Sequence, residues 1–157
     1  MLIRPMNEQD KQSILEILYN TPEFNPMDLA VAIEVIDDYL QNPVDSGYNI
    51  MVAEIDSNIA GYICYGHNSM TVSTWEIYWI AVSHNLQGQG IGRQLMAEAE
   101  ENIRKAGGKL IVLETSSTSL YDKTNRFYIN LDYKIDCQIK DYYAPNDDMI
   151  LYEKRIL

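Results

Sequence analysis

Cysteine, histidine and basic residues are scarce in this chain. Its 157 residues include 2 cysteines, 2 histidines and 12 lysines and arginines, against 23 aspartates and glutamates, for a formal net charge of −11. Nucleic acids and anionic membranes are bound mainly through basic surface, so this composition argues against both as partners. A cationic or neutral acceptor is expected instead, and a polyanionic ligand would have to rely on local donors.

The scarcity of thiols and imidazoles also limits redox and metal chemistry. Cys64 and Cys137 each lie within an apparent strand, in a chain without a secretory signal, so we expect reduced core thiols and no disulfide. His67 and His84 are isolated and belong to no cluster of ligand-type residues. No metal site is predicted.

Long apolar runs are absent too. No stretch approaches the roughly 18 consecutive apolar residues of a membrane span, and the first residues lack the apolar segment of a signal peptide. We therefore expect a cytoplasmic protein. A length of 157 residues with 46% hydrophobic residues predicts one domain covering residues 1–157. The sequence leaves open whether it is a monomer or a homodimer.

Strand-like and helix-like segments alternate along the chain without repeats or linkers. Asn7 is a plausible cap for the first helix, and a tight turn is expected at 56–58. The predicted order is β-α-α-β-β-β-α-β-α-β-β. The segments are a strand at 1–6, a helix containing Ile14, Ile17 and Leu18, a helix from Leu29 to Leu40, strands at 49–56, 59–67 and 75–82, a helix at 91–105, a strand at 109–115, a helix at 119–130, and strands at 133–140 and 148–156.

The glycine-rich segment Val82 to Gly92 is the most informative part of the sequence. It follows a strand pattern rich in aromatic and β-branched residues, and it precedes an amphipathic helix. Backbone N–H groups of such a turn, at the positive end of a helix dipole, bind anions. The segment therefore predicts a phosphate-bearing cofactor. The apolar face of the helix is Ile91, Leu95, Met96, Ala99 and Ile103.

Two common phosphate-binding motifs do not fit this segment. Arg93 stands where a P-loop needs lysine followed by serine or threonine, and where the dinucleotide fingerprint needs its third glycine. Gln87-x-x-Gly90-x-Gly92 instead resembles the pyrophosphate motif of the GCN5-related N-acetyltransferases (GNAT), a superfamily of coenzyme A dependent acyltransferases. The predicted order of elements is also that of the superfamily, so the resemblance covers nearly the whole chain.

A second resemblance lies near the C-terminus. The spacing of Tyr121, Thr124, Phe127 and Tyr128, followed by the segment 141–148, is similar to a subgroup of the same superfamily. Tyr121 occupies the place where many members have an asparagine that binds the pantetheine arm. Asp132 replaces the usual glycine after the helix, where aspartate tolerates the left-handed conformation.

The resemblance implies an α/β (α+β) fold: a mixed, mostly antiparallel seven-stranded sheet with helices on both faces, splayed between strands 4 and 5. It also implies transfer of an acetyl group from acetyl-coenzyme A to a primary amine, by direct attack in a ternary complex. The pantetheine arm would lie along the fourth strand and the pyrophosphate at the glycine-rich turn. The cofactor-binding candidates are Ile80, Ala81, Val82, Gln87, Gly88, Gln89, Gly90, Ile91, Gly92, Arg93 and Tyr121.

Two residues are candidates for proton transfer. Glu76 lies six residues before Val82, so a regular strand places both on one face, and its aromatic neighbours should raise its pKa. It is our candidate base, and some superfamily members carry a glutamate at this spacing. Tyr128 is implied by the resemblance as the acid that protonates the leaving thiolate. The structural alternative for Glu76 is an exposed carboxylate at the end of the sheet. For Tyr128 it is an aromatic side chain that serves only in packing.

The acceptor site is expected between the helix-loop-helix at 19–42 and the last two strands. Two other functions stay open: a non-catalytic acyl-coenzyme A sensor, and an acyltransferase acting on a protein N-terminus or lysine. No residue favours a covalent intermediate. The substrate-binding candidates are Phe24, Tyr39, Tyr142 and Tyr143, with Tyr19 as a further wall residue and Glu23 or Asp147 to attract an ammonium group.

Overall fold

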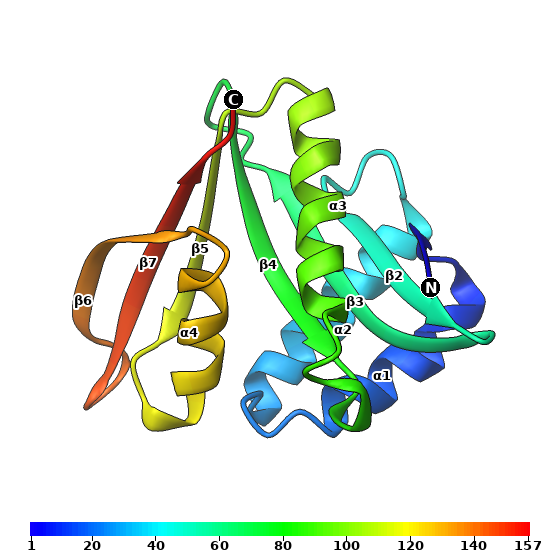
Figure 1. The fold of residues 1–157 in the computed structure, drawn as a ribbon, viewed down its shortest axis with the longest axis horizontal. Coiled ribbons are helices and arrows are strands. Elements are labelled where there is room, and N and C mark those ends of the chain that lie inside the picture. Colours follow the sequence, from blue (N-terminus) through cyan, green and yellow to red (C-terminus); the bar gives the residue numbers. More distant parts are fainter.

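The computed structural model describes all of residues 1–157 and contains one seven-stranded sheet in the order β1-β2-β3-β4-β5-β7-β6 (Figure 1). The β4–β5 pair is parallel and every other pair is antiparallel, which confirms the predicted mixed sheet. The elements are β1 (Leu2–Pro5), α1 (Lys11–Tyr19), α2 (Pro26–Gln41), β2 (Asn49–Ile55), β3 (Asn58–His67), β4 (Thr74–Val82), α3 (Ile91–Lys105), β5 (Leu110–Ser116), the short 3₁₀ turn η3 (Ser119–Tyr121), α4 (Asp122–Ile129), β6 (Lys134–Ala144) and β7 (Asp147–Arg155).

Local sequence signals explain where the first helices and the first hairpin begin. The side chain of Asn7 accepts a hydrogen bond from the Gln9 N–H and caps a 3₁₀ turn that leads into α1. Asn25 caps α2, whose first residue is Pro26. Between β2 and β3 the residues Asp56 and Ser57 both have positive φ, as a tight hairpin turn requires.

Helices cover the sheet on both faces, as predicted (Figure 1). On one face, the buried residues of α3 pack with those of β2, β3 and β5 in a core of 18 residues. On the other face, α1 and α2 pack against β2, β3 and β4 in a core of 13 residues. Each of the five apolar positions predicted for α3 is buried: Ile91, Leu95, Met96, Ala99 and Ile103.

The strands β4 and β5 pair over only three residues each. Their ladder joins Thr74–Glu76 to Leu110–Val112 and then ends. Beyond it β4 continues to Val82 beside β3, and β5 continues to Ser116 beside β7. Figure 1 shows the two strands together at the end near the C-terminus and far apart at the other end. The predicted splay between strands 4 and 5 is confirmed.

A bulge in β4 corrects the prediction made for the faces of this strand. The pairing with β3 shifts between Ile77 and Trp79, so Tyr78 is an extra residue, and such an insertion reverses the alternation of side chains. Ile77 packs on the α3 side, and so do Ile80 and Val82 beyond the bulge. Glu76 precedes the bulge and alternates with Ile77, so it lies on the face opposite to Val82, not on the same face.

The two cysteines lie in different environments. Cys64 is buried in the core under α1 and α2, as expected, whereas Cys137 is exposed. The prediction of a core thiol at Cys137 is wrong because β6 is the edge strand and all of its residues are exposed. Asp132 has φ of 66°, so aspartate does adopt the left-handed conformation after α4. None of the helices has both the length and the apolar character that crossing a membrane requires.

Candidate active site

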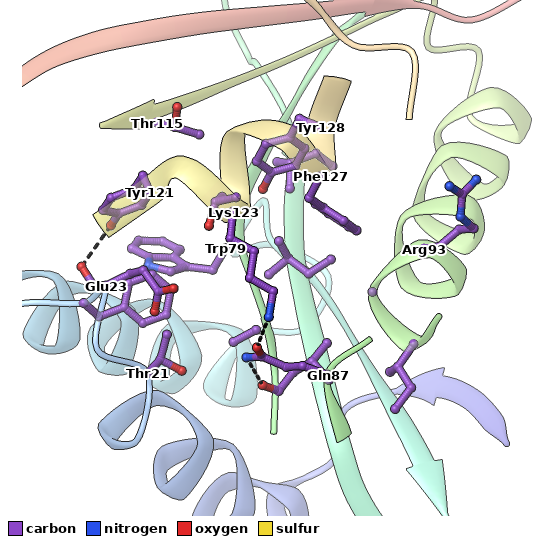
Figure 2. Close-up of a pocket in the computed structure, with 18 of the residues that line it drawn as sticks. Thr21, Glu23, Trp79, Gln87, Arg93, Thr115, Tyr121, Lys123, Phe127 and Tyr128 are labelled. Carbon is purple, nitrogen blue, oxygen red and sulfur yellow. Dashed lines mark hydrogen bonds between the residues drawn. The ribbon is translucent and has the colours of Figure 1, made fainter. Parts of the chain in front are cut away.

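A cavity of about 720 Å³ lies where β4 and β5 separate (Figure 2). Its walls come from β4 and β5, the turn before α3 and the start of α3, η3 and α4, the loop between α1 and α2 with the start of α2, and the end of β6. Helices α3 and α1 lie on opposite faces of the sheet. The cavity is therefore lined from both faces, and we describe its two ends as the α3 side and the α1–α2 side.

The glycine-rich turn forms the α3 side. Gly88 and Gly90 have φ of 77° and 83°, in the left-handed region that favours glycine. The first hydrogen bond of α3 runs from the Gln94 N–H to the Gly90 carbonyl at 3.1 Å, so the N–H groups of 91–93 remain outside the helical ladder. Together with the helix dipole, these donors can bind a phosphate.

Two cations lie on this same side. Arg93 is in the first turn of α3 and Lys123 is in the first turn of α4, and both line the cavity. The Lys123 ammonium donates to Gln87 Oε1 at 2.8 Å, and Gln87 Nε2 donates to the Val82 carbonyl at 3.2 Å (Figure 2). Lys123 follows β5 in the chain, and the turn that it contacts follows β4. This hydrogen bond therefore joins the two parts of the molecule that separate between β4 and β5.

The α1–α2 side is acidic. Ile111 and Leu113 are buried toward α3, so Glu114 lies on the other face of β5, which is also the face of Glu76. Burial raises the pKa of Glu76, and the charge of Glu114 raises it further. Burial also raises the pKa of Glu114. Neither carboxylate forms a salt bridge. Two more acidic residues line this side: Glu23 and Asp28.

Tyr128 lines the cavity from α4 and is buried. Its ring contacts the rings of Phe127, Tyr133 and Tyr152 at centroid distances of 5.3, 5.9 and 5.8 Å. Burial raises its pKa well above the ordinary value for tyrosine. Tyr128 can therefore remain a proton donor at any pH at which the protein works.

Hydrogen bonds fix α4 against the sheet. Asn125 Oδ1 accepts from the Thr115 hydroxyl at 2.6 Å and from the Tyr152 hydroxyl at 2.7 Å. Asn125 Nδ2 donates to the Ser116 carbonyl at 3.2 Å. Since these partners are on β5 and β7, α4 and its residue Tyr128 are attached to that half of the sheet.

The match to known families decides what this fold is. The acetyltransferase (GNAT) domain model matches residues 46–135. The chain belongs to the GNAT acetyltransferase family. A GNAT-family structure from Desulfovibrio desulfuricans is 34% identical with a TM-score of 0.95, covering 99% of both chains.

Two more distant similarities agree with this result. The uncharacterized N-acetyltransferase YvbK of Bacillus subtilis (strain 168) is 27% identical over 124 residues, 78% of this chain and 74% of YvbK. An aminoglycoside 6'-N-acetyltransferase complexed with coenzyme A has a TM-score of 0.78 at 21% identity, covering 100% of this chain and 98% of that one. This last similarity bears on the fold alone.

Most of the residues predicted for the GNAT site line the cavity, and five do not. Gln89 is exposed outside it. Tyr39 is buried between α2 and the sheet, where its hydroxyl donates to the Met6 carbonyl at 3.4 Å. Tyr142 is on edge strand β6 and 52% exposed. Tyr19 and Asp147 also lie outside the cavity, whereas Phe24, Tyr143 and Glu23 line it.

The sequence analysis missed three charged residues of the cavity, which are Asp28, Glu114 and Lys123. Lys123 lies two residues after Tyr121 in the C-terminal motif. A single lysine at the start of a helix forms no pattern that predicts a binding site. Glu114 alternates with Ile111 and Leu113 along β5, which is the ordinary pattern of a solvated strand face. Its closeness to Glu76 depends on the β4–β5 register, which pairs Glu76 with Val112.

Proposed function

We propose that this protein transfers the acetyl group of acetyl-coenzyme A to a primary amine of a small, positively charged molecule. The observation that carries the proposal is the charge arrangement of one cavity. Backbone donors, Arg93 and Lys123 surround its α3 side, and carboxylates line its α1–α2 side. A polyanionic cofactor and a cationic acceptor can thus bind from opposite faces of the sheet and meet in the gap between β4 and β5.

In this proposal the cofactor occupies the α3 side. The N–H groups from Gln87 to Arg93 bind the pyrophosphate, and the main chain of Ile80 to Val82 pairs with the pantetheine arm. That part of β4 has no partner on the β5 side, because the ladder ends at Glu76. An unpaired strand edge offers backbone donors and acceptors that an extended amide chain can satisfy.

The acceptor enters from the α1–α2 side as an ammonium ion and loses a proton to Glu76, directly or through water. The amine nitrogen then attacks the thioester carbonyl, a C–N bond forms, and the C–S bond breaks. Glu76 releases that first proton to solvent and then takes the second proton from the nitrogen of the tetrahedral intermediate. Tyr128 protonates the leaving thiolate and regains its proton from Glu76 through water. Because the raised pKa of Glu76 lies closer to neutrality than that of an ordinary carboxylate, it is a better proton acceptor.

The test combines binding with turnover. Calorimetric titration with acetyl-coenzyme A should give saturable binding that weakens when the pyrophosphate half of the ligand is removed. Release of free coenzyme A thiol should then be followed with monoamines, diamines, neutral amines and a lysine peptide, and the acetylated product identified by mass spectrometry. Binding without transfer to any amine would favour a sensor, and transfer only to the peptide would favour a protein acceptor.

A further inference from the structure

Tyr121 makes a contact that its place in the family motif does not imply. Its hydroxyl donates a hydrogen bond of 3.0 Å to the backbone carbonyl of Glu23, 98 residues earlier in the chain (Figure 2). We infer that Tyr121 is a positioning residue for the acceptor, holding the loop between α1 and α2 in place, rather than a contact to the cofactor. This inference rests on the proposed function, because that loop forms part of the acceptor side.

Within the loop, residues 20–25, the other hydrogen bonds are local, including one from the Phe24 N–H to the Thr21 carbonyl at 3.2 Å, and the Phe24 side chain packs against the core under α1 and α2. The Thr21 hydroxyl donates to the Ile17 carbonyl at the end of α1, at 2.7 Å. Asn25 and Asp28 cap the start of α2 through reciprocal side-chain and backbone hydrogen bonds. Glu23 lies between these two anchors. The bond from Tyr121 is therefore the hydrogen bond that ties the middle of the loop to a distant segment of the chain.

This link crosses the cavity. Tyr121, Glu23 and Phe24 all line it, Tyr121 from η3 and the other two from the loop. η3 continues into α4, which Asn125 fixes to β5 and β7. The Glu23 carbonyl is consequently held by the half of the sheet that also carries Tyr128.

The hydroxyl of Tyr121 can donate a single hydrogen bond, and the Glu23 carbonyl accepts it. Burial raises the pKa of Tyr121 to about 12, so the hydroxyl remains a donor over the range in which an enzyme is assayed. A pantetheine carbonyl would have to displace Glu23 in order to receive this hydrogen bond. The ring can still form part of the cavity wall beside the cofactor.

Replacement of Tyr121 by phenylalanine tests the inference, since Tyr121→Phe keeps the ring and removes the bond. We expect the KM for the amine to rise roughly three- to tenfold, as the loss of one net hydrogen bond predicts, with the Kd for acetyl-coenzyme A changed less than twofold. Amide hydrogen exchange in residues 20–25 should speed up by a similar factor without any ligand. Tyr65→Phe is the matched control: its hydroxyl accepts from Asn102 at 3.3 Å, outside the cavity, and neither constant should change.

Two results would overturn the inference. One is weaker binding of acetyl-coenzyme A by Tyr121→Phe with an unchanged KM for the amine, which would make Tyr121 a cofactor contact. The other is unchanged exchange in the loop. If the wild-type protein acetylates no amine, the proposed function fails, and the exchange experiment still decides whether Tyr121 holds the loop.

Discussion

The two sides of the cavity are built in different ways. Apart from Lys123 of α4, the α3 side comes from one continuous segment, and it uses mainly backbone: two left-handed glycines and the first N–H groups of α3. The α1–α2 side uses side chains from separate places in the chain, brought together by the sheet register and a bulge. The α3 side depends on backbone conformation, and the α1–α2 side depends on the charge and pKa of its side chains. Mutations on the α3 side should therefore change cofactor binding, and mutations on the α1–α2 side should change reaction with the amine. The acidic residues of the α1–α2 side are Glu23, Asp28, Glu76 and Glu114.

The largest effect is expected from Glu76→Gln. Removal of a general base lowers kcat/KM by about 10²- to 10³-fold, while acetyl-coenzyme A should bind as before because Glu76 lies on the face away from the glycine turn. Steady-state kinetics and calorimetry measure the two quantities. Glu34→Gln, an exposed glutamate of α2 outside this cavity, is the control and should keep full activity. A Glu76→Gln enzyme with near-normal kcat/KM would leave the candidate base without support.

The stability of Glu76→Gln should confirm that its loss of rate is not unfolding. Because folding raises the pKa of Glu76, its ionised form costs stability at pH above the folded pKa. That cost disappears as the pH falls below the unfolded value of about 4.3, where the carboxyl is protonated in both states. The variant should thus have a higher thermal midpoint than wild type at pH 7.5 and no advantage at pH 4.

Tyr128→Phe should reduce kcat by about 10- to 10²-fold, at or below the lower end for acid catalysis, because a thiolate is a good leaving group. Since the pKa of Tyr128 is raised, wild-type kcat should show no decline from its ionisation up to about pH 10. Tyr133→Phe is the comparison: it removes a buried hydroxyl that donates to Glu100 at 3.0 Å, away from the cavity. Tyr133→Phe should lower the stability of the protein without lowering kcat. An equal loss of kcat in both variants would indicate that Tyr128 acts only through packing.

The contrast between the two sides of the cavity also explains which features could be predicted from the sequence. The turn and α3 are contiguous, and their glycines and four-residue apolar repeat are local signals, so both were predicted with their neighbouring strands. The bulge at Tyr78 forms in the pairing with β3 and has no local signal, so Glu76 was assigned to the wrong face. Cys137 resembles a core position in its own segment, and only the strand order places it at the edge.

The acceptor side was predicted less well for a related reason. Tyr39 was assigned to the cavity from its place in the helix-loop-helix, although its spacing from Val35 and Ile36 puts it on the buried face of α2. Tyr142 was assigned from its position beside the last two strands, without knowledge of which face of β6 it would occupy. Side chains that meet through register, such as Glu76 and Glu114, cannot be paired before the sheet is known.

Cofactor binding should respond to the backbone of the glycine turn. Gly90→Ala forces a β-carbon into a left-handed conformation, which costs roughly 1–2 kcal/mol, and relaxation of the turn should raise the Kd for acetyl-coenzyme A by about tenfold. Gly47→Ala is a matched control, because Gly47 has φ of 81° and, like Gly90, has nothing within 4 Å of an added β-carbon. Both variants should lose similar stability in denaturant unfolding, and only Gly90→Ala should lose affinity. Equal affinity in the two would contradict a phosphate site at this turn.

The smallest effect, and the one that probes the acidic side most directly, is expected from Glu114→Gln. The negative charge of Glu114 raises the pKa of Glu76, so removing this charge should lower it. The acid limb of the kcat/KM profile, where activity rises as the base ionises, should therefore move to lower pH, while the plateau changes only a few-fold for a cationic amine. An amine that stays unprotonated throughout this limb should show the same shift without the few-fold loss, since it gains nothing from the extra charge. A limb that stays in place or moves to higher pH would show that Glu76 and Glu114 do not titrate together, and the base would have to be sought elsewhere in the cavity.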